Sequence, residues 1–257
     1  MTPWYRFKRR NPRRSRLAMF LWWTLVPWIL IPLARVVYGF RIHGRRHCPS
    51  EGPVLVICNH QSMLDPMIAG LTLRERGFRP LARMSLKKDL PRLVAWLMSW
   101  YDVIFIDPDE PSVSSFKDVL KELKESRVSI MFPEGARSSD GCLAPFQPGV
   151  WVLIRRGKAP VLPMAVEGPF DVMPPGSGLR RRGRIEVKVG TPIPCAELLE
   201  MGREAALEHL REVVDDLRME LRADIRKRSR GRWPRSGPAD QSIRDQHRSA
   251  DDVNEGA

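Results

Sequence analysis

The residue types best suited to chemistry lie in one short stretch, His60 to Pro66, directly after an apolar run. An imidazole can accept a proton near neutral pH, and a carboxylate on its other nitrogen fixes the tautomer and stabilises the imidazolium. His60 and Asp65 are five positions apart, so they do not share a helix face. They can meet only if a turn between a strand and a helix folds one back toward the other. The spacing therefore predicts general-base chemistry at the end of a strand.

Each of these two residues also has a structural explanation when it is taken alone. Asp65 precedes a proline, so it would make a good helix cap with Pro66 at the first helical position. His60 would serve as a hydrogen-bonded structural histidine. Short motifs often match by chance, so the catalytic interpretation needs support from elsewhere in the chain.

A second cluster, Phe132 to Ser138, follows another apolar run. Gly135 permits a tight backbone approach, and Arg137 offers a forked, permanently charged donor that suits phosphate. Free backbone N–H groups in such a loop can add to an anion site. The alternative is an ordinary strand-to-loop turn that carries a solvated arginine.

The elements that must position these clusters follow from the hydrophobic pattern after about residue 50. Short β-branched runs predict buried strands at 54–58, 103–106, 128–132 and 161–166, and alternation predicts a half-exposed strand at 185–189. Helical spacing predicts helices at 90–101, at 113–123 and from 196 to 221. This alternation predicts an α/β fold, layered, with a largely parallel sheet flanked by helices. The first cluster then lies at the carboxyl end of a strand, where such sheets bind ligands.

Composition limits the classes of protein that fit. The chain has 257 residues and 43% hydrophobic content, enough for one full core. Its four cysteines are Cys48, Cys58, Cys142 and Cys195, which lie far apart and argue against a disulfide scaffold or a zinc site. The net charge of +13 implies an anionic partner, which charge alone leaves open among nucleic acid, an anionic bilayer and a phosphorylated substrate.

The N-terminus favours the membrane. Residues 1–16 hold seven basic residues and no acidic one, and residues 17–34 carry no charge. No signal-peptide cleavage site closes this apolar run, and Pro27 and Pro32 would kink a spanning helix. The run is short for a full crossing, and basic residues flank both sides. We therefore expect an N-terminal membrane-associated helical segment that re-enters or lies on the membrane, with a buried core helix as the alternative.

These observations predict three regions. Residues 1–46 form a basic arm and apolar membrane anchor, residues 47–228 form the catalytic domain, and residues 229–257 form a disordered polar tail. The basic residues adjoin an apolar anchor and no recognisable nucleic-acid module is present, so we expect a membrane surface with anionic lipids and no nucleic acid as partner.

Taken in order, the two clusters resemble signatures of the 1-acyl-glycerol-3-phosphate acyltransferase family. Its first signature, N-H-x-x-x-x-D, is matched by Asn59, His60 and Asp65. Its third, F-P-E-G-T-R-S, is matched by residues 132–138 with alanine in place of threonine. Its fourth, an apolar strand that holds a proline, is similar to residues 161–166. The resemblance covers roughly residues 40–215, and the combination is far more specific than any one motif.

The resemblance implies both the site and the reaction. His60, oriented by Asp65, is the general base, and no covalent acyl-enzyme forms. The residues implied in substrate binding are Asn59, Arg83, Glu134, Gly135, Arg137 and Ser138. The donor is acyl-CoA or acyl carrier protein, the acceptor is a lysophospholipid, first of all 1-acyl-glycerol-3-phosphate, and neither a metal nor an organic cofactor is needed. The oxyanion donors are expected among backbone N–H groups of the Glu134–Gly135 loop or near His60. The enzyme is expected at the cytoplasmic face of the cell membrane.

The second signature is where the chain departs from the family. The family pattern G-x-x-F-I-D-R ends in an arginine that helps to hold the acceptor phosphate, and this chain has Pro108 there. Proline offers no donor, so a bidentate contact is lost and Arg83 and Arg137 remain as the cations. An acceptor that is another lipid alcohol or a glycolipid therefore stays open. So do a thioesterase, with water as acceptor, and a non-catalytic membrane-binding protein.

Overall fold

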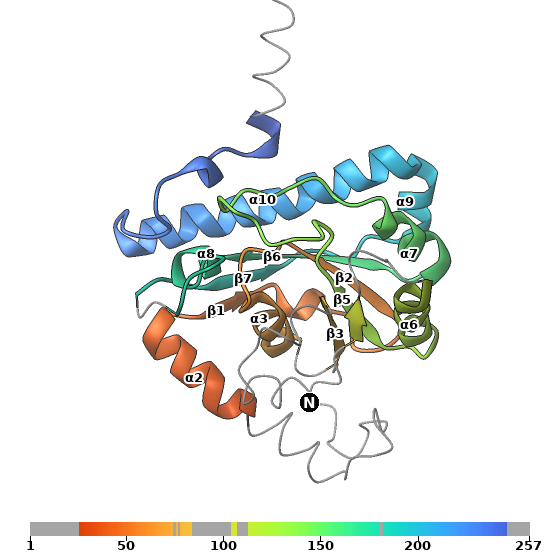
Figure 1. Ribbon diagram of the computed structural model, residues 1–257, viewed down its shortest axis with the longest axis horizontal. Coiled ribbons are helices and arrows are strands. Elements are labelled where there is room, and N and C mark those ends of the chain that lie inside the picture. Colours follow the sequence, from red (N-terminus) through yellow and green to blue (C-terminus); the bar gives the residue numbers. More distant parts are fainter. Residues whose placement is uncertain are drawn as a thin grey trace, which may run out of the picture.

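A seven-stranded sheet forms the centre of the molecule, in the order β1-β7-β6-β2-β5-β3-β4 (Figure 1). The computed structural model describes residues 26–73, 76, 78–83, 104–106, 113–179 and 182–245. The strands are β1 (Arg41–His43), β2 (Val54–Cys58), β3 (Phe78–Arg83), β4 (Ile104–Ile106), β5 (Val128–Met131), β6 (Val161–Glu167) and β7 (Glu186–Val189). All neighbouring strands pair in parallel except β6 and β7. The predicted α/β fold with a largely parallel sheet is confirmed.

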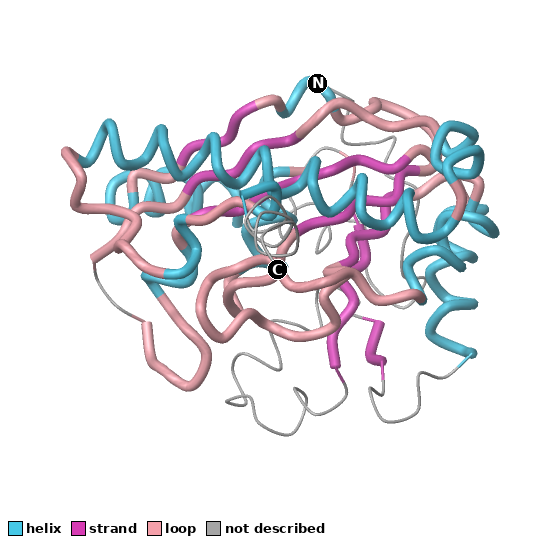
Figure 2. The backbone as a smooth tube through the Cα atoms, turned by 90° about the horizontal axis from the view of Figure 1, so that it is seen from above, coloured by secondary structure: helices cyan, strands magenta, loops and turns pink. Residues whose placement is uncertain are grey.

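Helices cover both faces of this sheet. They are α2 (Val26–Tyr38), α3 (Asp65–Thr72), α6 (Val113–Lys124), α7 (Gly149–Gly157), α8 (Pro169–Val172), α9 (Cys195–Met201) and α10 (Arg203–Ser229), with short 3-10 turns η3 (Arg45–His47) and η4 (Pro238–Asp240). Strand β2 shows the layering, because Leu55 and Ile57 pack with α6, α7, α9 and α10 while Val54, Val56 and Cys58 pack with α2 and α3. Coverage on both faces explains its uninterrupted apolar sequence. Figure 2 looks down on the face that α10 covers.

The five predicted strands lie close to the observed β2, β4, β5, β6 and β7, whereas β1 and β3 were not predicted, and the helices match less well. Strand β2 has the predicted bounds, β5 ends at Met131 and β6 extends to Glu167. Strand β7 is more buried than predicted, because Glu186 is 2% exposed beneath neighbouring elements. The single predicted closing helix is two helices, α9 and α10, which meet at Gly202 with φ of 81°. The predicted helix at 90–101 lies outside the described residues.

The C-terminal segment, residues 230–245, corrects the prediction of a disordered tail. It folds back along α10 (Figure 1), where Ala239 and Ile243 are 4% and 2% exposed. Its backbone carbonyls at Ala239 and Gln241 accept hydrogen bonds from the buried guanidinium of Arg218. A polar composition suggested disorder, but here the polar groups satisfy buried charges on a helix, which also stabilises a chain. Residues 246–257 lie outside the described residues.

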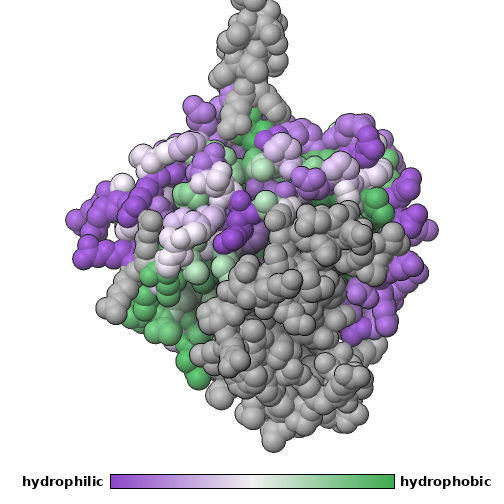
Figure 3. All heavy atoms as spheres, in the orientation of Figure 1, coloured by the Kyte–Doolittle hydropathy of each residue, from purple (hydrophilic) through white to green (hydrophobic). Residues whose placement is uncertain are grey.

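Helix α2 is the described part of the predicted N-terminal anchor. Ile31, 4% exposed, packs against the sheet, whereas Trp28, Ile29, Leu33 and Val36 are 69%, 58%, 55% and 83% exposed. Hydrophobic surface accordingly gathers over α2 (Figure 3). Within the ranges that the structure describes, no helix combines the length and apolar character needed to cross a membrane.

Candidate active site

The turn after β2 brings His60 onto Asp65. The N–H of Asp65 donates to the carbonyl of Ser62 at 3.2 Å, which closes the turn between the strand and α3. This places the Nδ1 of His60 2.9 Å from Oδ2 of Asp65. Since Nδ1 is occupied by the carboxylate, Nε2 remains as the proton acceptor. Residues that are five positions apart thus meet in the geometry that general-base chemistry requires.

The Asp65 carboxylate orders the turn as well as the imidazole. It is fully buried, and its Oδ2 also accepts the backbone N–H groups of Gln61 and Ser62, each at 2.6 Å. Asp65 is the first residue of α3, and Pro66 follows it. The N-cap is therefore Leu64, without a side-chain hydrogen bond, so the predicted helix cap at Asp65 is wrong, and the carboxylate orders the turn before the helix instead.

The second cluster holds His60 from its backbone. The His60 N–H donates to Oε1 of Glu134 at 2.6 Å, and its carbonyl accepts the N–H of Ser138 at 2.8 Å. The His60 ring stacks on Phe132 with centroids 4.3 Å apart and planes at 26°. The His60 side chain is 18% exposed. The two clusters are therefore one site, which limits how the imidazole can turn.

Glu134 is the clamp between the two loops. It is 5% exposed, and its second oxygen, Oε2, accepts the N–H of Ala144 at 2.9 Å. Burial raises the pKa of Glu134 to about 7, against the opposing effect of the N–H donors of Ala144 and His60. Glu134 therefore lies at the site, as predicted, as a buried group that holds the two loops together.

Asn59 and Ser138, both predicted to bind substrate, have side chains that form hydrogen bonds within the protein. The Asn59 side chain donates to the carbonyl of Val166 at 2.9 Å and accepts its N–H at 2.7 Å, so it pairs with β6 as a strand would. The Ser138 hydroxyl donates to Asp140 at 3.0 Å and accepts the N–H of Gly141 at 2.8 Å. Both side chains are buried, and these hydrogen bonds satisfy their polar groups. They position the loops that carry the site.

Three other predicted residues lie at the same edge of the sheet. Gly135 is exposed with φ of 74°, a conformation that favours glycine. Arg137 is half-buried and forms no ion pair within the described ranges. Arg83 is the last residue of β3, which runs parallel to β5, so its backbone lies at the carboxyl edge. Pro108 lies outside the described residues.

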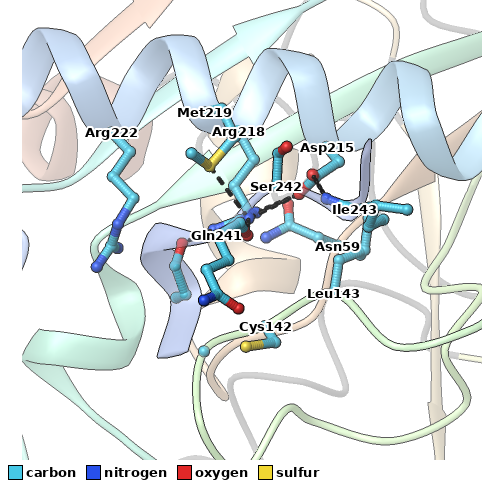
Figure 4. Close-up of polar contacts among 12 residues, drawn as sticks. Asn59, Cys142, Leu143, Asp215, Arg218, Met219, Arg222, Gln241, Ser242 and Ile243 are labelled. Carbon is cyan, nitrogen blue, oxygen red and sulfur yellow. Dashed lines mark hydrogen bonds and ion pairs between the residues drawn. The ribbon is translucent and has the colours of Figure 1, made fainter. Parts of the chain in front are cut away.

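Gln61 and Glu167 belong to the site although the sequence did not indicate them. Gln61 Nε2 donates to Oε2 of Glu167 at 3.2 Å and to the carbonyl of Gly141 at 3.3 Å. Oε1 of Glu167 accepts Nη1 of Arg222 at 2.5 Å. The only sequence signal was a carboxylate at the end of a fully buried strand. Figure 4 shows Arg222 and Arg218 projecting from α10, with Asn59 below this helix.

Cys58, next to the motif, is not set up as a nucleophile. It is fully buried, and burial followed by the charges of Asp65 and Glu134 raises its pKa well above the ordinary value. The thiol therefore stays protonated. In the part of the chain that the structure describes, no cluster of three or more His, Cys, Asp or Glu side chains is arranged to hold a metal ion.

Comparison with known proteins places this site in a family. Residues 39–167 match the Acyltransferase family. The chain is 24% identical over 186 residues to 1-acyl-sn-glycerol-3-phosphate acyltransferase of Bacillus subtilis, covering 71% of this chain and 88% of that protein. It is 30% identical over 160 residues to the chloroplastic enzyme BAT2 of that name from Brassica napus, covering 61% of this chain but 45% of the relative.

The fold has a solved counterpart. The crystal structure of the 1-acyl-sn-glycerophosphate acyltransferase PlsC from Thermotoga maritima superimposes with a TM-score of 0.66 at 22% identity, over 82% of this chain and 84% of that one. At this identity the likeness shows the fold alone. The family match covers half of the chain and contains both halves of the His60 site. The chain therefore belongs to the Acyltransferase family.

Proposed function

We propose that this enzyme transfers a fatty acyl group from acyl-CoA or acyl carrier protein to a hydroxyl of 1-acyl-glycerol-3-phosphate. The observation that carries the proposal is the His60–Asp65 contact of 2.9 Å, with the carboxylate fully buried and Nε2 left available. The relatives in Bacillus subtilis and Brassica napus are named 1-acyl-sn-glycerol-3-phosphate acyltransferases, which supports the choice of acceptor.

In the proposed reaction His60 Nε2 takes the proton of the acceptor hydroxyl as its oxygen attacks the thioester carbonyl. The tetrahedral intermediate collapses, the C–S bond breaks, and the thiolate leaves with the proton that His60 returns. Asp65 stabilises the imidazolium between these two transfers. No acyl group is bound to the protein at any step, so transfer needs donor and acceptor together.

The oxyanion of that intermediate requires hydrogen-bond donors that no protein acceptor uses. The amides next to the imidazole are engaged, because the N–H of His60 binds Glu134 and that of Gln61 binds Asp65. In contrast, the N–H groups of Ala136 and Arg137 have no acceptor among the described residues. These two amides are the best candidates, one to two residues beyond the expected Glu134–Gly135 position.

Arg137 and Arg83 are the cations proposed for the acceptor phosphate. Arg137 carries one of the two candidate amides, and Arg83 ends a strand at the same sheet edge. Pro108 in place of the family arginine favours a second candidate, in which the acceptor is another lipid alcohol or a glycolipid. The acyl transfer at His60 would be the same for either acceptor.

We further propose that the enzyme works bound to the cytoplasmic face of the cell membrane. Helix α2 exposes Trp28 and Val36 on a face that no described element covers. The sequence before it contains the basic arm of residues 1–16. An apolar helix face with adjoining cations suits binding at an anionic bilayer surface.

The test is His60→Ala, with His209→Ala on α10 as the control that removes an imidazole away from the site. Thiol release from acyl-CoA is measured with 1-acyl-glycerol-3-phosphate, other lysophospholipids, lipid alcohols or no acceptor. We expect His60→Ala to lower transfer by ~10²–10⁴-fold while circular dichroism stays unchanged. Transfer by folded His60→Ala within a few-fold of wild type would contradict the base assignment. Preference for a non-phosphorylated alcohol would favour the second candidate, and thiol release without acceptor would indicate a thioesterase.

A further inference from the structure

A polar pocket lies where α2, the edge strand β1, β7 and the end of α10 meet. Its volume is about 280 Å³. The residues that line it are Arg35, Val36, Gly39, Arg41, Arg184, Glu186, Ile225 and Arg228. None of them belongs to the loops around His60. Four arginines and one carboxylate therefore share a small space.

The one carboxylate is already neutralised. Glu186 is 2% exposed, and its Oε2 lies 2.8 Å from Nε2 of His43 and 2.5 Å from Nη2 of Arg228. No ion pair joins Arg35, Arg41 or Arg184 to an acidic residue in the described part of the chain. Three guanidinium groups around the pocket thus have no counter-charge among the described residues, which makes the pocket an attractive site for an anion.

Gly39 makes room for one of these guanidinium groups. A Cβ atom at this position would lie 3.1 Å from Cδ and 3.2 Å from Nη1 of Arg184. Gly39 also has φ of 57°, which side chains rarely adopt. The bare backbone lets Arg184 lie over it, on the side of the pocket where α2 ends.

We infer that this pocket binds the phosphate of an anionic membrane phospholipid, at a site distinct from the one that carries out acyl transfer. The volume is near the lower end of the ~300–1,000 Å³ typical of ligand pockets, so it fits a headgroup and not a whole lipid. Guanidinium groups bind phosphate in forked, bidentate pairs. Val36 lines the pocket and is 83% exposed on α2, so the phosphate site is continuous with hydrophobic surface. This continuity favours a lipid over a free phosphate.

The pocket lies where a bound headgroup could orient the enzyme on the membrane. Strand β7 is antiparallel to β6, which is parallel to β2, so β1 and β7 begin at the edge where β2 ends. The pocket and His60 therefore lie at the same edge of the sheet. A headgroup bound there would hold this edge toward the bilayer from which the acceptor comes. The inference rests on the proposed membrane association and adds a defined headgroup contact to it.

The experiment compares three double variants of the full chain in vesicle sedimentation. Arg41→Gln with Arg184→Gln removes two cations, Arg41→Lys with Arg184→Lys keeps the charge but removes the forks, and Arg155→Gln with Arg156→Gln removes two cations from α7. The vesicles are phosphatidylcholine alone and phosphatidylcholine with phosphatidylglycerol, which is neither the proposed acceptor nor its product. At about 1 kcal/mol per cation, the glutamine pair should weaken binding to the anionic vesicles by about 30-fold. The lysine pair should weaken it several-fold, and the α7 control should bind as wild type does.

Two outcomes would overturn the inference. Wild-type binding by the lysine pair would show a diffuse charge effect without a pocket. Displacement of the wild type from vesicles by millimolar inorganic phosphate, at constant ionic strength, would assign the pocket to a free phosphate. Sedimentation does not depend on catalysis, and transfer to a short-chain acceptor in detergent should be unchanged in the lysine pair. Loss of vesicle binding with intact transfer therefore separates this site from the proposed function.

Discussion

The loops around His60 and the C-terminal segment are both built on buried carboxylates, but they hold them differently. At the catalytic loops, Asp65 and Glu134 are bound by backbone N–H groups and one imidazole. Along α10, Asp215 binds Arg218 at 2.7 Å, and Asp240 binds Arg222 at 2.6 Å. Among the described residues neither Asp65 nor Glu134 forms an ion pair with Lys or Arg, whereas Asp215 and Asp240 each form one.

This difference separates a working site from a structural one. A buried carboxylate without a cation is costly to ionise, so its pKa rises, as at Glu134. For Asp240 burial has the same tendency, but hydrogen bonds from Arg226 and Arg222 outweigh it and lower the pKa to about 2. A carboxylate that is paired with an arginine costs little free energy to keep ionised, so such pairs can hold a segment against a helix. Unneutralised carboxylates instead leave the histidine as the one group that can take up a positive charge in the reaction.

The largest effect on activity is expected from Asp65→Asn. The amide oxygen can still accept the N–H groups of Gln61 and Ser62, so the turn should persist. The charge that stabilises the imidazolium is lost, and transfer should fall by ~10²–10⁴-fold. Thiol release per folded protein measures this, with Asp216→Asn, an exposed carboxylate on α10, as the control. If folded Asp65→Asn keeps nearly full activity, the carboxylate in the His60 loops is structural, as are those along α10.

The largest effect on stability is expected from Arg218→Met. Arg218 is 1% exposed and Asp215 2%, so the change leaves a buried charge without its cation. Breaking a buried pair in this way costs about 3–5 kcal/mol in the free energy of unfolding. Denaturant unfolding measures it, and the transfer rate of the folded fraction should stay near wild type.

A second change tests the cause of that loss. Adding Asp215→Asn to Arg218→Met removes the unpaired charge and should recover part of the stability. If Asp215→Asn instead lowers the free energy of unfolding further, as it would at a site independent of Arg218, the loss in Arg218→Met does not come from an unpaired charge on Asp215.

The sequence predicted the parts of the molecule that depend on neighbours along the chain. The apolar run Val54–Cys58 gives the bounds of β2, and His60 and Asp65 are close enough in sequence for one turn to join them. Contacts across the fold were not predictable in this way. Gln61 and Glu167 are 106 positions apart, and either residue type alone is common on any surface.

Two contacts that composition could not predict involve polar groups. Asn59, whose predicted substrate binding stays a prediction, pairs its amide with the backbone of Val166. The segment 230–245 was predicted to be disordered from its polar composition, yet it supplies carbonyls to Arg218. Composition gives the number of polar groups and not their partners. The membrane attachment of residues 1–46 stays a prediction.

The pH dependence of stability should show the raised pKa of Glu134. Its pKa is 4.5 in the unfolded chain and about 7 in the fold, so the folded state holds a proton that the unfolded state releases. Stability from this group is complete below pH 4.5 and is lost as the pH rises through 7. The shift corresponds to about 3 kcal/mol, since each pKa unit is about 1.4 kcal/mol.

Denaturant unfolding at several values between pH 5 and pH 8 measures this loss. In Glu134→Gln the loss should be absent, although the variant is less stable at pH 5 because one of its two N–H donors is unpaired. If wild type and variant lose the same stability between these values, the pH effect comes from another group.

The smallest effect is expected from Asp240→Asn, and its sign with pH is opposite. The lowered pKa means that the ionised form favours the fold, so this contribution is present above pH 3.8 and is lost as the pH falls toward 2. Because the side chain is 30% exposed, solvent screening limits the contribution to about 1 kcal/mol at neutral pH. Denaturant unfolding at pH 7 should show that Asp240→Asn lowers the free energy of unfolding by this amount, and added salt should make the difference from wild type smaller. The transfer rate should be unchanged, because Asp240 contacts Arg222 and Arg226 and not the His60 loop. A fall in transfer without a fall in stability would instead mean that the C-terminal segment acts on the site through Arg222, Glu167 and Gln61.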